Sequence, residues 1–168
     1  CLTALSALIA AHAADTPNMY FSGQLVAEPC MLAPQDGLRE LDFNAVVDKD
    51  LYLHGRSSGR PITLRLLNCD ITEGRTQISV TFGGSPSAAL PGLVQLDGGG
   101  ASGLAIGLET LQGGALPLDT KNPLGVITTG TNDIAFMAYL QAEPDAQADR
   151  TIGLGPIKAS VTFTLNYD

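Results

Sequence analysis

The sequence contains a match to the nucleophile motif of serine hydrolases. Gly55, Ser57 and Gly59 occupy the glycine and serine positions of the G-x-S-x-G pattern. Such a serine needs a strand before it, a helix after it, and a histidine later in the chain that accepts its proton. His54 stands directly before the motif, and no histidine follows it. We therefore expect a glycine-rich surface loop here rather than hydrolase chemistry.

A second match points to phosphate binding. Gly98, Gly100 and Gly103 fit the G-x-G-x-x-G pattern. That pattern binds phosphate only where the glycines open a helix, because the helix N-terminus supplies the main-chain donors. Residues 104–108 instead have the composition of a strand, so the sequence predicts a flexible hairpin loop.

The sequence shows neither the pattern of a metal site nor a pair of catalytic carboxylates. After residue 13 the chain has one histidine and two cysteines, which do not form a four-ligand zinc pattern. The acidic residues are scattered, and no pair of carboxylates stands out. We expect no enzyme and no cofactor.

Composition narrows the class of partner. The 168 residues suit one domain, and a hydrophobic fraction of 45% is enough for a core. The net charge of −8 argues against a nucleic-acid partner, because such proteins carry basic surfaces. The apolar run at residues 2–11 is too short for a membrane span.

That apolar run predicts a signal peptide instead. It is followed by Ala-His-Ala at residues 11–13, which matches an A-x-A cleavage site. We expect residues 1–13 to be a truncated signal peptide, with a short core helix as the alternative. Cys30 and Cys69 remain after cleavage, and two cysteines in an exported chain predict one disulfide. The alternative is a pair of buried free thiols.

The clearest structural pattern is in residues 159–167, where apolar and polar side chains alternate without interruption. A period of two predicts a half-buried strand. No further segment follows it, so we expect no later strand of this chain on its far edge. Short alternating runs elsewhere, separated by turns, predict an all-β sandwich. We also expect a short strand at residues 41–47 and a polar loop at residues 48–60.

Several of these features occur together in one family. Phe21-Ser22-Gly23 lies shortly before Cys30, residues 62–69 run into Cys69, and Tyr167 is the penultimate residue. In this order and spacing the chain resembles the subunits of chaperone–usher pili of the type 1 and P pilus family. Residues 52–57 and 89–92 are most similar to the minor, adaptor pilins.

The resemblance implies an immunoglobulin-like sandwich that lacks its C-terminal G strand. A periplasmic chaperone, an outer-membrane usher and neighbouring pilus subunits would be its partners. It implies a donor-strand extension at residues 14–27 and a pilin domain at residues 28–168. The donor residues would be Met19, Phe21, Gly23 and Leu25. The alternative for this stretch is an ordinary first strand of its own domain.

On the acceptor side, the resemblance implies a groove that first binds the chaperone and then the next subunit's extension. Its expected residues are Val161, Phe163, Leu165, Tyr167, Asp168, Phe136, Ala138 and Leu140. The expected function is a minor or adaptor subunit that polymerises by donor-strand exchange and supports cell adhesion. The expected location is an extracellular pilus, reached through the periplasm of a Gram-negative bacterium. A pilus terminator and a stand-alone secreted binding module are the alternatives.

Overall fold

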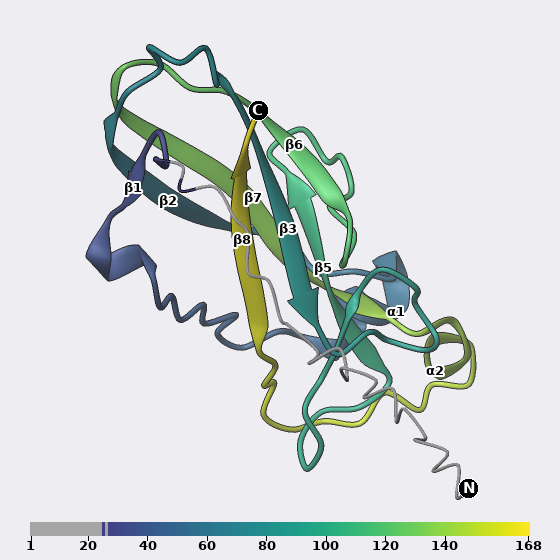
Figure 1. The fold of residues 1–168 in the computed structure, drawn as a ribbon. Helices are drawn as coiled ribbons and strands as arrows, with labels where there is room; N and C mark the ends of the chain where they lie inside the picture. Colours follow the sequence, from purple (N-terminus) through teal and green to yellow (C-terminus); the bar gives the residue numbers. More distant parts are fainter. Residues whose placement is uncertain (1–24, 26) are drawn as a thin grey trace, which may run out of the picture.

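The computed structural model describes Leu25 and residues 27–168, which form a β-sandwich (Figure 1). Alternating apolar and polar residues produce most of its strands, as the sequence predicts. The elements are β1 (Met31–Leu32), a 3-10 turn (Pro34–Asp36), α1 (Asp48–His54), β2 (Arg60–Cys69), β3 (Gln77–Gly84), β4 (Val94–Gln95), β5 (Leu104–Thr110), β6 (Lys121–Val126), β7 (Gly130–Ala142), α2 (Pro144–Ala148) and β8 (Val161–Tyr167).

The strands form two antiparallel sheets. One has five strands in the order β1-β2-β7-β5-β4, and the other has three in the order β6-β3-β8. Strand β8 is therefore an edge strand, with β3 as its one neighbour among the described residues. The all-β sandwich predicted from the sequence is confirmed.

The core lies between the two sheets. Phe82 of β3 and Phe136 of β7 meet across it, with their ring centroids 5.1 Å apart in an edge-to-face arrangement. Leu64 and Leu66 of β2 are buried, whereas Arg65 between them is exposed. The alternation along each strand thus separates core from solvent.

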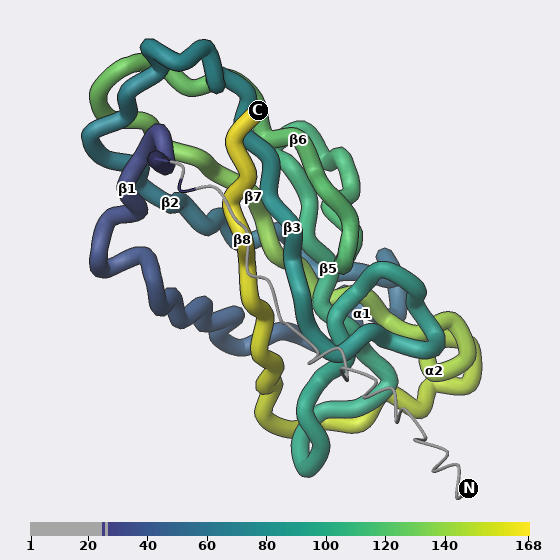
Figure 2. The backbone as a smooth tube through the Cα atoms, viewed as in Figure 1, coloured from purple at the N-terminus to yellow at the C-terminus, as the bar shows by residue number. Residues whose placement is uncertain are grey.

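The prediction of a strand at residues 41–47 is wrong. This segment pairs with no described strand, and Asn44 has a positive φ of 54°. Alternation makes a segment suitable for a sheet, but a strand also needs a neighbour to pair with. The tube from β1 to α1 accordingly runs alongside the sandwich (Figure 2).

The expected loop at residues 48–60 contains a helix. Helix α1 ends at His54 and is capped by Gly55, which has a φ of 72° and donates its N–H to the Leu51 carbonyl. A glycine in this left-handed conformation is a common helix terminator. In the part of the chain that the structure describes, no helix has the length and apolar character needed to cross a membrane.

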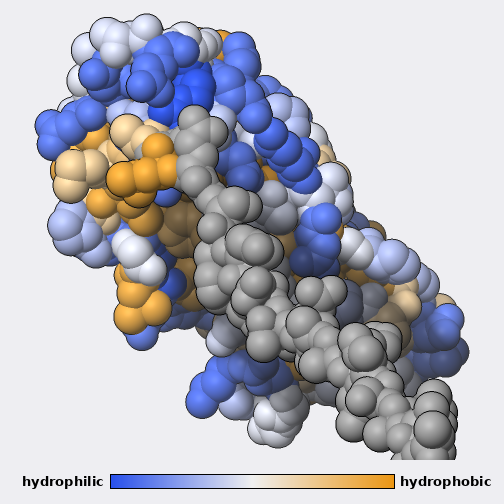
Figure 3. All heavy atoms as spheres, viewed as in Figure 1, coloured by the Kyte–Doolittle hydropathy of each residue, from blue (hydrophilic) through white to orange (hydrophobic). Residues whose placement is uncertain are grey.

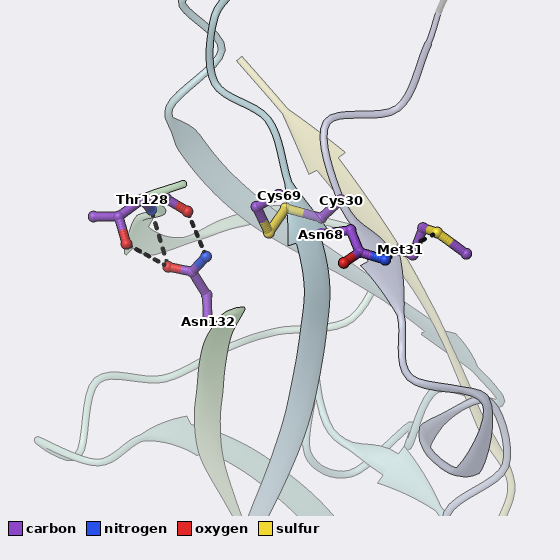
Figure 4. Close-up of a disulfide and its surroundings, with 6 residues drawn as sticks. All are labelled: Cys30, Met31, Asn68, Cys69, Thr128 and Asn132. Carbon is purple, nitrogen blue, oxygen red and sulfur yellow. Dashed lines mark hydrogen bonds between the residues drawn. A yellow bond between two sulfur atoms is a disulfide. The ribbon is translucent and has the colours of Figure 1, made fainter. Parts of the chain in front are cut away.

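A disulfide joins Cys30 to Cys69 (Figure 4), as the cysteine count predicts. Both cysteines are buried, in a small cluster with Leu66, Ile78 and Ile134. The bridge ties the start of the domain to the end of β2, the strand next to the centre of the larger sheet.

The glycine-rich loop at residues 98–103 has a structural role. Main-chain hydrogen bonds join it to the segment before β8: Asp97 N–H to Lys158 O at 2.7 Å, and Ala101 N–H to Pro156 O at 2.9 Å. A Cβ atom on Gly100 would overlap the Pro156 carbonyl oxygen. A glycine at position 100 therefore lets the loop hold the chain that leads into β8.

We predict that replacing both cysteines with alanine lowers the free energy of unfolding by about 3–4 kcal/mol. The bridge closes a loop with a sequence separation of 39, and its loss returns that loop's entropy to the unfolded chain. Urea unfolding of the oxidised and double-variant proteins measures the difference. A loss below about 1 kcal/mol would contradict this role of the bridge.

Gly100→Ala should lower the free energy of unfolding by about 1–3 kcal/mol, because the added methyl group has no room. Gly98→Ala is the matched control in the same loop, since no atom lies within 4 Å of its added Cβ. Urea unfolding of both variants provides the comparison. Equal losses would show that the loop does not pack tightly on residues 153–158.

Candidate functional site

An apolar groove of about 790 Å³ runs beside β8 on its free side. Its floor is part of the core and comes from both sheets. Figure 3 shows apolar surface set back beside the segment that follows β1. The lining side chains from the strands are Ile62, Leu64, Phe82, Ile106, Leu108, Phe136, Ala138, Val161 and Phe163.

One wall of the groove is the outer edge of β8, which pairs with no second strand among the described residues. Gln77 and Asp168 exchange two main-chain hydrogen bonds of 3.0 Å, which marks them as a hydrogen-bonded pair of the β3–β8 ladder. In an antiparallel ladder such pairs alternate with pairs whose main-chain groups point outward. The outward-pointing residues of β8 are therefore Val161, Phe163, Leu165 and Tyr167. Their N–H and C=O groups face the free edge.

The opposite wall is formed by residues 37–43. No main-chain hydrogen bond joins residues 38–42 to another described residue. Leu41 and Phe43 turn toward the core, while Leu38 at the rim is 84% exposed. The groove thus lies between strand β8 and an irregular segment, and both have main-chain groups without a partner among the described residues. An extended peptide placed there would meet partners on both sides.

Four of the predicted acceptor residues line this groove. They are Val161 and Phe163 on the β8 wall, and Phe136 and Ala138 on the floor. Leu140, two residues farther along β7, is completely buried in the core and is not part of the lining. Strand β7 has 13 residues, and its Leu140 end packs beyond the groove.

The other three predicted acceptor residues lie near the C-terminal end of β8. Leu165 and Tyr167 pack against the disulfide cluster, outside the groove lining. Burial, together with the nearby charge of Glu28, raises the pKa of the Tyr167 hydroxyl. Asp168 accepts a hydrogen bond of 2.7 Å from the Lys121 ammonium of β6. The predicted residues therefore divide between a groove and a separate strand end.

Three of the predicted donor residues, Met19, Phe21 and Gly23, lie outside the residues that the structure describes. The fourth, Leu25, is fully exposed. A fully exposed leucine just before the domain has no packing role within its own described fold.

Sequence reasoning missed the wall at residues 37–43 and the groove's end at residues 157–160. The alternation of Leu41 and Phe43 was a signal for an extended segment, but it did not reveal what the segment faces. The floor residues from β2 and β5 were equally invisible, because they follow the same pattern as ordinary core residues.

The serine of the hydrolase motif has structural partners. The Ser57 hydroxyl accepts a hydrogen bond of 2.9 Å from the Leu140 N–H, and the Ser57 N–H donates to the Leu140 carbonyl at 2.9 Å. Helix α1 precedes the motif, where the hydrolase motif requires a strand. Ser57 thus continues the main-chain pairing of β7 beyond the start of β2 instead of presenting a nucleophile.

Next to it, Arg56 forms an ion pair that the sequence did not reveal. Its guanidinium donates two hydrogen bonds, of 2.6 and 3.1 Å, to the buried carboxylate of Glu109 and lies 3.7 Å from the centre of the Tyr139 ring. The bond to Glu109 is the main reason that the pKa of Arg56 is raised. This cluster fastens the segment after α1 to the larger sheet.

Comparison with known proteins places the whole fold in one family. The family model described as "Fimbrial protein" matches residues 19–168. The chain is 35% identical over 159 residues to the uncharacterized fimbrial-like protein YfcP of Escherichia coli K12, covering 92% of this chain and 85% of that protein. It is 31% identical over 168 residues to the fimbrial adapter PapK of Escherichia coli, covering 97% and 94%.

The fold also matches a solved structure, the P pilus rod subunit PapA. The TM-score is 0.72 at 21% identity, with 84% of this chain and 100% of that chain covered. At this identity the match establishes the fold and nothing more. Together with the sequence relatives, it shows that the chain belongs to the fimbrial protein family and is a structural subunit of a chaperone–usher pilus, an extracellular fibre that Gram-negative bacteria assemble through the periplasm with a chaperone and an usher.

Proposed function

We propose that this subunit occupies an internal, adaptor-type position in the pilus and polymerises by donor-strand exchange. The groove beside β8 accepts a strand from another chain, and residues 14–27 are donated to another subunit's groove. One observation carries the acceptor half of this proposal. The groove is open and has an apolar floor, and among the described residues neither the outer edge of β8 nor residues 38–42 have main-chain partners.

The physical reason is the cost of an unpaired edge. Main-chain N–H and C=O groups beside an apolar surface need partners, and an exposed strand edge is a template for another strand. A strand added to β8 satisfies both walls and covers the apolar floor. This is recognition by β-strand addition, in which the main chain supplies affinity and side-chain pockets supply specificity.

The donor half rests on the pattern of the N-terminal stretch. Met19, Phe21 and Leu25 alternate on one face, and Gly23 falls in the same series. Burial of one large apolar side chain is worth about 1.5–3 kcal/mol. Three such anchors would contribute roughly 5–9 kcal/mol before the cost of ordering the strand. Gly23 would allow the backbone to pass close to the acceptor.

The position of the groove also suits a growing fibre. Cys30, where the chain becomes buried, lies near Tyr167 at the C-terminal end of β8. The groove is lined by Val161 at the N-terminal end of β8 and by the segment before it. Figure 1 shows these two regions at opposite ends of the smaller sheet. A donor and an acceptor on different surfaces make a head-to-tail contact, which extends into a filament when it does not close into a ring.

An internal position is favoured over a terminating one because the groove is open. A terminator gives its own strand to a neighbour but accepts none, so its groove would be filled or closed. The lining side chains leave a space of about 790 Å³, and none of the described residues closes it.

We also propose that the protein is not an enzyme. The Ser57 hydroxyl is engaged with the main chain of Leu140, and His54 is exposed on α1, before the motif. The relatives named above are fimbrial proteins. A stand-alone secreted binding module is the competing function, and it would fold stably with an empty groove.

A synthetic peptide of residues 14–27 should bind the purified domain and raise its melting temperature, because it binds the folded state alone. Ala159→Trp should weaken this binding at least tenfold, since Ala159 lines the groove. Ala88→Trp, at an exposed position outside the lining, is the matched control. Fluorescence anisotropy measures the affinities. A stable domain that ignores both this peptide and a pilus chaperone would refute the acceptor role.

Gly23→Leu should leave the chaperone-bound subunit at its normal yield but impair donation to the next subunit. The reason is that the added side chain would stand where the donor backbone approaches the acceptor. Ser22→Leu places the same side chain on the other face of the alternating stretch and serves as the control. Assembly of pili by electron microscopy and subunit yield by immunoblot provide the two measurements. Normal assembly with Gly23→Leu would contradict the donor role.

A further inference from the structure

The junction between the N-terminal extension and the domain is bound by several contacts, although part of it is exposed to solvent. We call residues 27–30 the root of the extension. Leu25 is fully exposed and Ala27 and Glu28 are exposed, whereas Pro29 and Cys30 are buried. The chain therefore enters the domain within four residues.

The loop between β2 and β3 holds one side of the root. The Arg75 guanidinium donates a hydrogen bond of 2.5 Å to the Ala27 carbonyl, and the Asp70 N–H donates one of 2.7 Å to the Pro29 carbonyl. Carbonyls two residues apart point to the same side of an extended chain. The loop thus binds the carbonyls of Ala27 and Pro29. The disulfide from Cys30 to Cys69 adds a covalent bond at the next residue.

The end of β8 lies close to the root as well. Tyr167, the last residue of β8, packs against the buried cluster that contains Cys30 of the root. Glu28, between the two carbonyls that the loop binds, adds to the raised pKa of the Tyr167 hydroxyl. The root is therefore placed between the β2–β3 loop and the end of β8. Among these contacts, the bond from Arg75 to Ala27 lies farthest from the domain along the chain.

Arg75 is not needed to close its own loop. Asp70 accepts a hydrogen bond from the Thr72 N–H at 2.9 Å, and the Gly74 N–H donates to the Ile71 carbonyl at 2.9 Å. These bonds shape the turn without the guanidinium. Glu73 instead forms an ion pair of 2.8 Å with the guanidinium, through the same nitrogen that binds the Ala27 carbonyl. The arginine side chain is thus directed at the root.

We propose that Arg75 is a positioning residue that fixes the direction in which the N-terminal extension leaves the domain. The proposal rests on the donor function proposed above, because that direction then sets the orientation of this domain relative to the subunit that receives the extension. Without Arg75, the last fixed point of the chain is Pro29, and the dihedral angles of Ala27 and Glu28 are free to vary. The extension would still be donated, but neighbouring domains would be less well oriented.

The test measures the exit direction in the full chain. Nitroxide labels are placed at Leu25→Cys in the extension and at Leu53→Cys on α1, two exposed positions on different parts of the molecule. Pulsed electron paramagnetic resonance gives the distribution of distances between them. We expect one narrow distribution in the parent chain and at least a twofold broader one with Arg75→Gln.

Two further variants separate positioning from general stability. Arg75→Lys keeps a donor for the Ala27 carbonyl and should restore a width close to that of the parent chain. Arg65→Gln removes a different exposed arginine, one that pairs with Asp133 on β7, and should leave the width unchanged. If Arg75→Gln folds poorly, Arg75→Met, which keeps the apolar stem, takes its place in the same measurement.

An equal width with and without Arg75 would overturn the proposal. The measurement needs neither a bound peptide nor an acceptor subunit, so it does not depend on the success of donor-strand exchange. Failure of the proposed function would appear instead as a stable domain that binds neither a peptide of residues 14–27 nor a pilus chaperone. The two outcomes can therefore be told apart.

Discussion

The free edge of β8 is the constraint on which the rest of the structure depends. Val161 and Phe163 of this strand direct both main-chain groups away from β3 and line the groove. Residues 38–42 line its other side and form no main-chain hydrogen bond with another described residue. Main-chain groups in such a place must find partners in water or in another chain. Because the space between the two edges is apolar, water is the poorer partner. Under the proposed function, this space is the position of one more strand.

The floor of that space is the core itself. Phe136 contacts Phe82 across the two sheets and also lines the groove, so the same side chain serves the fold and the site. Under the proposed function, the donated strand completes the core as well as joining two subunits. Folding and assembly are then coupled, because apolar surface that is exposed in the isolated domain becomes buried in the pilus. The chaperone's strand would supply the same burial at an earlier stage.

The two motif matches illustrate how local patterns acquire other roles in this fold. Ser57 sits in a hydrolase-like pattern, yet its hydroxyl binds the main chain of Leu140. Gly100 sits in a phosphate-binding pattern, yet it is the absence of a side chain that lets residues 97–101 hold the segment before β8. In both cases the residue holds a connecting segment in place through main-chain contacts. A motif specifies residue types at fixed positions in the sequence, whereas the role of each residue depends on which distant residues it contacts in the fold.

The sequence by itself determined the all-β class and the disulfide. These depend on a period of two and on a count of two cysteines, which are local or additive properties. The tertiary structure alone decided which residues form the groove. Residues 41–47 alternate like a strand but pair with no strand in the described part of the chain. Leu140 alternates with Phe136 and Ala138 but is buried beyond the groove. Pairing and burial depend on segments that are distant in the chain, so no local pattern contains them.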